Sequence, residues 1–321
     1  MIATRFTERV GCSVPIQLAA MPGIGAPELV AAVADAGAVG MLSATMVEPA
    51  QLSATLAQLT GNPRRVIGVN FLIPFLDREC VAIAARRARI VEFFYGDPDP
   101  RLVAEAAAHG ALVSWQVGSV AEAVAAQAAG CDFVIAQGTE GGGHLRGRES
   151  ILSLLPEVLE AVEIPVVAAG GIGSARDLAA ILAFGAGGAR LGTRFVAARE
   201  SGAHPVYVRA LVAAQSSEDT CVTDVFSQLW PGAPHRVLRS AITAVQRCVQ
   251  DPIGEIRIGG RAVAVSRYSA IAPTRETTGH IDAMALYAGE SVVDVHTVQP
   301  AATIIAELVR GAAAILASTG E

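Results

Sequence analysis

Eight short apolar runs recur along the first two thirds of the chain, and alanine-rich amphipathic segments separate them. Continuously apolar runs of this kind are typical of parallel strands that are buried on both faces of a sheet. Eight strand–helix units in succession favour a closed barrel over an open doubly wound sheet. The sequence therefore predicts an α/β fold of the (β/α)8 TIM barrel class. The predicted strands span residues 16–21, 39–43, 66–71, 90–95, 112–117, 133–137, 166–169 and 189–195.

The segments between these strands have the pattern of helices. Four of them end just before Gly37, Gly110, Gly130 or Gly185, where glycine supplies the left-handed residue that closes a helix. The fourth unit has the weakest pattern, because residues 77–89 are few and rich in charge. The other predicted helices span residues 27–36, 49–59, 101–108, 120–129, 150–161 and 175–184.

The regular alternation stops after the eighth strand. Residues from about 200 to 300 have weak periodicity with scattered proline and glycine, and an alanine-rich helix at 301–317 then resumes the pattern. We expect residues 1–199 and 300–321 to form the barrel, and residues 200–299 to form a long insertion that caps it or makes a small subdomain. An independent C-terminal domain is the alternative, which the small number of strong strands in the insertion disfavours.

Composition excludes several classes of partner and chemistry. The formal net charge is −6 and no basic stripe is visible, so we expect no nucleic acid and no anionic membrane as partner. No uninterrupted apolar run reaches the roughly 18 residues of a membrane span, and residues 1–11 lack the apolar core of a signal peptide. All 24 basic residues are arginine, so Schiff-base and P-loop chemistry, which need a lysine, are excluded.

The cysteines point to a reducing compartment. Their number is odd and none lies close to another in sequence, so we interpret them as reduced thiols of a cytoplasmic protein rather than a disulfide framework or a zinc site. The oligomeric state stays open, with a homodimer as one alternative. The five positions are Cys12, Cys80, Cys131, Cys221 and Cys248.

Active sites of such barrels form at the C-terminal ends of the strands. Here these ends are rich in glycine and neutral amides and poor in carboxylates and histidines, which disfavours a magnesium or zinc enzyme. Amide side chains and bare backbone suit a large neutral heterocycle such as a flavin ring. The residues predicted to contact this ring are Ala20, Met21, Pro22, Asn70, Gln116, Gln137, Gly142, Gly143 and Ala169.

Glycines after the seventh and eighth strands predict a phosphate site. Gly170 and Gly171 follow one strand, and Gly192 and Thr193 belong to the next. In barrels these two loops commonly bind a phosphate through backbone N–H groups. Tight turns alone would also explain the glycines, but two such loops in adjacent terminal units favour the phosphate. We therefore expect FMN as the cofactor, a mononucleotide, and no metal.

His144 is the candidate catalytic residue. Three glycines precede it, and the loop follows a buried strand into the predicted mouth of the barrel. Glycines let a loop lie close to a ligand, and histidine is the side chain best suited to proton transfer near neutral pH. A structural loop histidine is the alternative. Among the other histidines only His235 has a context of interest.

The same segments resemble the nitronate monooxygenase family, once called 2-nitropropane dioxygenases. The resemblance implies an FMN-dependent barrel, a catalytic base at His144, and phosphate contacts at Gly170, Gly171, Gly192 and Thr193. It departs at Gly141, where the family often has alanine, and at Glu290, where it often has glutamine. The segments are 19–23 (Ala-Ala-Met-Pro-Gly), 68–71 (Gly-Val-Asn-Phe), 137–144 (Gln-Gly-Thr-Glu-Gly-Gly-Gly-His), 168–172 (Ala-Ala-Gly-Gly-Ile), 192–195 (Gly-Thr-Arg-Phe), 219–220, 230–231 and 234–236.

The resemblance identifies fold and cofactor better than reaction, because FMN-dependent enoyl-acyl-carrier-protein reductases and NADH:quinone reductases share these segments. The expected reaction is oxidation of alkyl nitronates, from nitroalkanes, with FMN and O₂ to a carbonyl compound and nitrite. An NAD(P)H oxidoreductase acting on a quinone or an enoyl thioester is one alternative. A flavin-binding protein without turnover is another, which the intact His144 loop disfavours.

Overall fold

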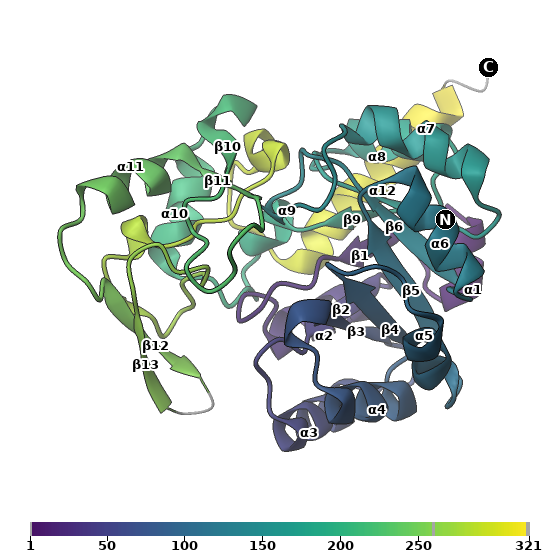
Figure 1. Cartoon of the computed structure of the whole chain (residues 1–321). Coiled ribbons are helices and arrows are strands. Elements are labelled where there is room, and N and C mark those ends of the chain that lie inside the picture. The colour runs from purple at the N-terminus through teal and green to yellow at the C-terminus, as the bar shows by residue number, and fades with distance from the viewer. Residues whose placement is uncertain (1, 259–260, 319–321) are drawn as a thin grey trace.

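A computed structural model, which describes residues 2–258 and 261–318, shows a closed barrel of eight parallel strands (Figure 1). Neighbouring strands pair in chain order, and β1 closes the barrel against β9. The (β/α)8 prediction is confirmed. The barrel strands are β1 (Ile16–Leu18), β2 (Val39–Ser43), β3 (Val66–Leu72), β4 (Ile90–Phe94), β5 (Leu112–Val117), β6 (Phe133–Gln137), β8 (Val166–Ala169) and β9 (Gly188–Leu191).

Helices surround the strands, and local sequence explains where most of them begin. Proline occupies the first position of three of them, where its missing N–H is no loss. Serine or aspartate side chains accept from the first-turn N–H groups of α4 to α8. The helices are α1 (Arg5–Val10), α2 (Pro27–Asp35), α3 (Pro49–Leu59), α4 (Arg78–Arg87), α5 (Pro100–Ala107), α6 (Val120–Ala128), α7 (Ile151–Ala161), α8 (Ala175–Ala183) and the short 3₁₀ helix η1 (Ile73–Phe75).

Two predicted strands are too long at the barrel mouth. The first, expected at 16–21, ends at Leu18, because the following residues turn to line a cavity. The eighth, expected at 189–195, ends at Leu191, and the short helix α9 (Thr193–Val196) begins directly after Gly192. The weak fourth unit does contain a helix, α4, whose first N–H groups are accepted by the side chain of Asp77.

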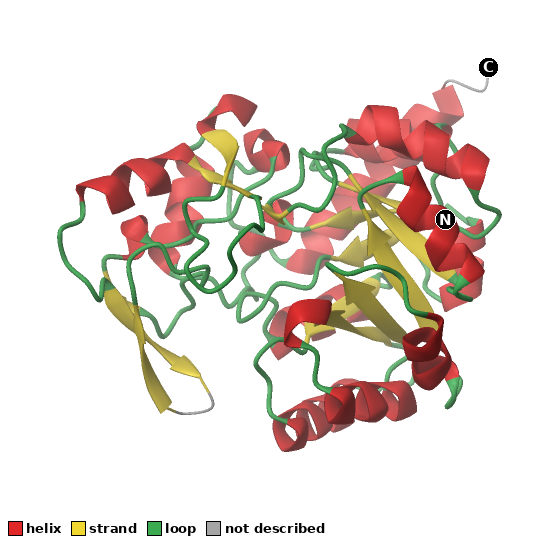
Figure 2. Cartoon of the chain, in the orientation of Figure 1, coloured by secondary structure: helices red, strands yellow, loops and turns green. Residues whose placement is uncertain are grey.

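The chain between α9 and the last helix forms a lobe beside the barrel (Figures 1 and 2). It packs around a second hydrophobic cluster. It contains more strands than the sequence predicts, but each has two to five residues, too short for a clear pattern. The division at 200–299 stays a prediction. The elements are α10 (Pro205–Ala213), η2 (Ser217–Asp219), β10 (Thr220–Thr223), β11 (His235–Leu238), α11 (Arg239–Arg247), β12 (Gly254–Ile258), β13 (Arg261–Val265), β14 (Thr278–Gly279), η3 (Ile281–Ala283) and η4 (Glu290–Asp294).

The last helix, α12 (Ala301–Ser318), returns to the barrel and packs against α8 and α2. It is the one helix of the described residues that is long and apolar enough to cross a membrane by length and composition. Its inward face buries Ile304, Ile305 and Leu308 in the barrel's main hydrophobic cluster. We therefore interpret α12 as the outer helix of the eighth unit.

Candidate active site

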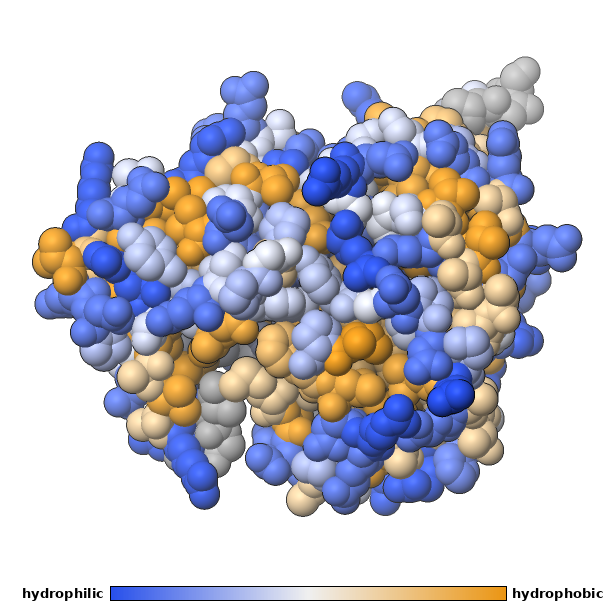
Figure 3. Space-filling model, in the orientation of Figure 1, coloured by the Kyte–Doolittle hydropathy of each residue, from blue (hydrophilic) through white to orange (hydrophobic). Residues whose placement is uncertain are grey.

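A cavity of about 450 Å³ lies at the C-terminal ends of the barrel strands. It lies between the barrel and the chain from α9 to α12, which is called the inserted segment below. Figure 3 shows a notch in the surface between the β12–β13 hairpin and the barrel. The structure brings every sequence-predicted site residue to the wall of this cavity. They are His144, Ala20, Met21, Pro22, Asn70, Gln116, Gln137, Gly142, Gly143, Ala169, Gly170, Gly171, Gly192 and Thr193. Their contacts with FMN remain predictions.

His144 belongs to a two-residue strand, β7 (Gly143–His144), that the sequence did not reveal. This strand pairs with β11, and His144 lies opposite His235. The pairing fixes the histidine on a sheet that the barrel loop and the inserted segment build together. Gly143 precedes it with a φ of +80°, a conformation that glycine adopts without strain.

Aromatic side chains surround the His144 ring. The ring centroid of Trp230 lies 4.2 Å away at an interplanar angle of 30°, and that of Tyr287 lies 5.6 Å away. Tyr95, at the end of β4, approaches edge-on at 6.2 Å. The Nε2 atom of His144 is buried and has no hydrogen-bond partner among the described residues. A buried ring nitrogen without a partner, on the wall of a cavity, is available to a bound ligand.

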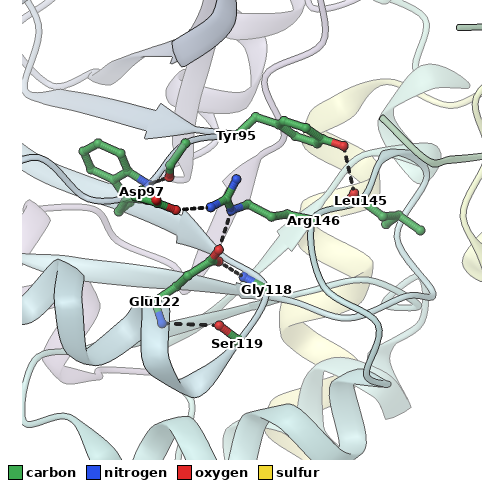
Figure 4. A network of polar contacts seen from close by, with 9 residues as sticks. Tyr95, Asp97, Gly118, Ser119, Glu122, Leu145 and Arg146 are labelled. Carbon is green, nitrogen blue, oxygen red and sulfur yellow. Dashed lines mark hydrogen bonds and ion pairs between the residues drawn. The ribbon is translucent and has the colours of Figure 1, made fainter. Parts of the chain in front are cut away.

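Polar contacts hold the chain on both sides of His144. Gln137 donates from Nε2 to the His144 carbonyl at 3.1 Å. After the histidine, Tyr95 donates from its hydroxyl to the Leu145 carbonyl at 3.3 Å (Figure 4). Arg146 forms ion pairs with Asp97 and with Glu122 of α6. The loop therefore sits on the barrel at several points, which suits a side chain that must be positioned accurately.

Burial keeps His144 neutral. Burial, together with a smaller repulsion from His235, lowers the pKa of His144 to about 3. Burial also lowers the pKa of His235. The Nε2 atom of His235 accepts from the Phe226 N–H at 3.2 Å, so its Nδ1–H donates to the Ala233 carbonyl at 3.0 Å. Both nitrogens of His235 are thus hydrogen-bonded to backbone groups, and its ring centroid lies 5.3 Å from that of His144.

The loops predicted to bind phosphate consist of bare backbone. Gly170 and Gly171 have φ values of +109° and +70°. A Cβ on Gly142 would lie 2.6 Å from the backbone nitrogen of Gly289, so the loop passes there only as glycine. Thr193 accepts from that same Gly289 N–H at 2.9 Å. Glu290, one of the two departures from the family pattern, is absent from the cavity wall and pairs with Arg236 at 3.0 Å.

A buried ion pair in the barrel interior escaped the sequence analysis. Arg190 of β9 also lines the cavity, and its guanidinium pairs with Glu92 of β4. Both are charged residues inside short apolar strands, and that signal was available in the sequence. The aromatic residues Trp230 and Tyr287 were also missed as neighbours of His144, because the pairing of β7 with β11 brings them there.

The cavity fits FMN. The amide side chains of Asn70, Gln116 and Gln137 on its wall can hydrogen-bond the ring edge. The Oε1 atom of Gln137 is buried without a partner among the described residues. Glycine backbone from the loops after β8 and β9 leaves room for a phosphate to approach N–H groups. The volume lies within the range of about 300–1,000 Å³ typical of ligand pockets.

Comparisons with known proteins show what this chain is similar to. The model of the family described as nitronate monooxygenase matches residues 67–311. A curated relative from Rhodococcus jostii, (3aS,4S,5R,7aS)-5-hydroxy-7a-methyl-1-oxo-octahydro-1H-indene-4-carboxyl-CoA dehydrogenase, is 36% identical over 240 residues. The match covers 74% of this chain and 66% of that relative, just under two thirds of its length.

Two solved structures match nearly the whole chain. FabK from Thermotoga maritima has a TM-score of 0.80 at 27% identity, covering 99% of both chains. Nitroalkane oxidase from Streptomyces ansochromogenes has a TM-score of 0.78 at 28% identity, covering 98% of this chain and 100% of the other. Both likenesses run through the barrel and through the inserted segment.

Proposed function

The chain belongs to the nitronate monooxygenase family and is an FMN-dependent oxidoreductase, and from this premise we propose that it oxidises alkyl nitronates with O₂ to a carbonyl compound and nitrite. The observation that carries the proposal is the neutral ring of His144, whose Nε2 atom lacks a partner in an aromatic wall of the cavity. The likeness to a nitroalkane oxidase over the whole chain supports it.

His144 can act as a base whose strength rises as the reaction proceeds. In the substrate-free site the ring is neutral and can accept a proton from the carbon beside a nitro group. The nitronate formed is an anion next to the ring, and an adjacent negative charge favours the protonated imidazole. Burial then strengthens the attraction, because little water screens it. A preformed nitronate needs no such step.

The other residues of the wall would bind and orient the cofactor. Asn70, Gln116 and Gln137 would hold the ring edge of FMN, and the glycine loops would hold its phosphate. When bound, FMN supplies the electron acceptor for the substrate. The aromatic side chains Trp230 and Tyr287 keep water from His144 and present an apolar surface to the alkyl part of the substrate.

Product analysis tests this proposal. Purified protein in air should consume O₂ and release nitrite and acetone from propane-2-nitronate. Catalase and superoxide dismutase in parallel assays separate turnover from radical chains in solution. Release of nitrite no faster than with free FMN at the same concentration would refute nitronate oxidation.

A second candidate function is favoured by the mouth of the cavity. Met46, Phe75 and Leu229 are exposed and line the cavity, and Arg257 of β12 also lines it. This mouth is apolar with a cation at its rim, a combination that suits a large acyl group carrying an anionic carrier. The Rhodococcus relative is named for a CoA substrate. Oxidation of NADH that depends on an enoyl-CoA would support this function and oppose the first.

A further inference from the structure

A buried ion pair lies inside the barrel next to the predicted flavin site. Glu92, in the centre of β4, is 0% exposed, and Arg190, on β9, is 5% exposed and lines the cavity. A buried ion pair adds little stability compared with apolar residues of the same volume, because both charges lose their hydration. The Glu92–Arg190 pair is therefore better explained by a function in the flavin site than by a contribution to stability.

Glu92 and Arg190 fix the orientation of two amide side chains, those of Asn70 and Gln116. Asn70 donates from Nδ2 to Glu92 Oε1 at 2.9 Å, and Arg190 donates to Gln116 Oε1 at 2.5 Å. A carboxylate accepts and a guanidinium only donates, so neither amide can flip without losing its hydrogen bond. These two hydrogen bonds use Asn70 Nδ2 and Gln116 Oε1, which leaves Asn70 Oδ1 and Gln116 Nε2 for other partners. Both residues line the cavity.

A third amide completes the set. Gln137 donates from Nε2 to the His144 carbonyl, which leaves its Oε1 atom buried as an unused acceptor. The wall thus offers acceptors at Asn70 and Gln137 and a donor at Gln116. The pyrimidine edge of a flavin alternates a carbonyl, an N–H and a second carbonyl. Such an edge is complemented by two donors and one acceptor, of which Gln116 can supply one donor and either Asn70 or Gln137 the acceptor.

We propose that Glu92 and Arg190 are positioning residues for FMN. They fix the Asn70 oxygen and the Gln116 nitrogen toward the flavin edge, and their opposite charges leave the barrel interior neutral beneath the ring. The proposal rests on FMN binding in this cavity. The flavin content of the purified protein tests that premise separately.

The charge balance has a measurable consequence. Two-electron reduction with uptake of one proton leaves the flavin ring negatively charged at neutral pH. Arg190→Gln would leave the Glu92 carboxylate uncompensated and disfavour the reduced cofactor. Glu92→Gln would leave the guanidinium uncompensated and favour it. The double variant would restore neutrality but would no longer fix the amides, because a glutamine amide both donates and accepts.

The experiment measures the two-electron midpoint potential and the dissociation constant of FMN in these three variants. We expect the ratio of affinities for reduced and oxidised FMN to fall at least tenfold in Arg190→Gln and to rise at least tenfold in Glu92→Gln. For a two-electron couple tenfold corresponds to about 30 mV. The double variant should return to the wild-type potential and bind oxidised FMN about tenfold more weakly. Arg78→Gln, which removes an exposed ion pair with Glu105, is the matched control and should match wild type.

Opposite shifts in the two single variants would support the proposal, because a purely structural role would move both in one direction. Shifts of the same sign, or none, would overturn it. If neither single variant retains FMN, the double variant is used instead. Wild-type affinity of the double variant for FMN would overturn the proposal. Weaker binding, with the melting temperature of its apoprotein unchanged from wild type, would support it. Failure of all three to fold would assign the pair to barrel stability and would also overturn it.

Discussion

At the scale of single residues, His144 carries the proposed chemistry, and its surroundings set its properties. The ring lies against Trp230 and faces His235 across a strand pair. Burial, and to a smaller extent repulsion from His235, lowers its pKa to about 3. A neutral base that is not hydrogen-bonded at Nε2 can take a proton without first breaking an existing contact.

Replacement of His144 tests whether this residue acts as a base or only binds the nitronate anion. General-base help is worth about 10²–10⁴ in rate. We expect His144→Asn to lose most of that factor in kcat/KM on neutral nitroalkanes and to lose much less on preformed nitronates. FMN content should stay near wild type, because other loops hold the cofactor. Equal losses on the two substrate forms would show that His144 orients the anion and is no base.

The low pKa of His144 also predicts how stability changes with pH. The folded-state pKa, about 3, lies below the unfolded value of about 6.5. Between these values the unfolded chain binds more protons, so stability falls as pH falls through this window. Urea midpoints at pH 7.5, 6.5 and 5.5 should therefore decline less steeply in His144→Gln than in wild type. An identical decline in both proteins would contradict the buried neutral histidine.

At the scale of elements, the barrel strands and helices were predictable because each carries its own signal. Buried parallel strands are mostly apolar, and proline, serine, aspartate or glycine marks many helix ends. The short strands β7 and β10 to β14 carry no such signal. Gly143 and His144 form a strand only because β11, far along the chain, pairs with them.

The residues of the candidate site also divide into those that the sequence predicts and those that it does not. Residues at strand ends, such as Asn70 and Gln137, could be predicted because topology alone brings the strand ends to one face of a barrel. Trp230 and Tyr287 could not, because their position depends on how the inserted segment folds onto the barrel. Glu92 and Arg190 gave a signal that was overlooked, namely charge inside apolar strands.

The glycine loop after β8 gives a prediction at the element scale. A valine at Gly171, where φ is +70°, would put its Cβ 3.1 Å from the Glu140 Cβ and would fill space beside the cavity. We expect Gly171→Val to bind FMN at least tenfold more weakly, measured by fluorescence titration of the apoprotein. Gly110→Val is the matched control, because its φ is +88° and nothing lies within 4 Å of its Cβ. Equal FMN affinity in the two variants would remove Gly171 from the phosphate site.

At the scale of the whole molecule, two hydrophobic clusters meet at the site. One fills the barrel and its helices, and the other fills the inserted segment. His144 lies where they join, held by β7 on one side and by the barrel loops on the other. In the proposed function the barrel loops would hold the cofactor, and the inserted segment adds Trp230, Arg257 and Tyr287 to the cavity wall that a substrate would meet. This arrangement explains why fold and cofactor are easier to assign than substrate.

Anaerobic mixing of the FMN-loaded protein with each candidate electron donor is the most direct test of nitronate oxidation. The absorbance of bound FMN is followed in a stopped-flow instrument with propane-2-nitronate and, separately, with NADH and NADPH. We expect rapid bleaching by the nitronate and none by either nicotinamide on the same timescale. Rapid bleaching by NADH or NADPH, with none by the nitronate, would contradict nitronate oxidation and identify the protein as a reductase.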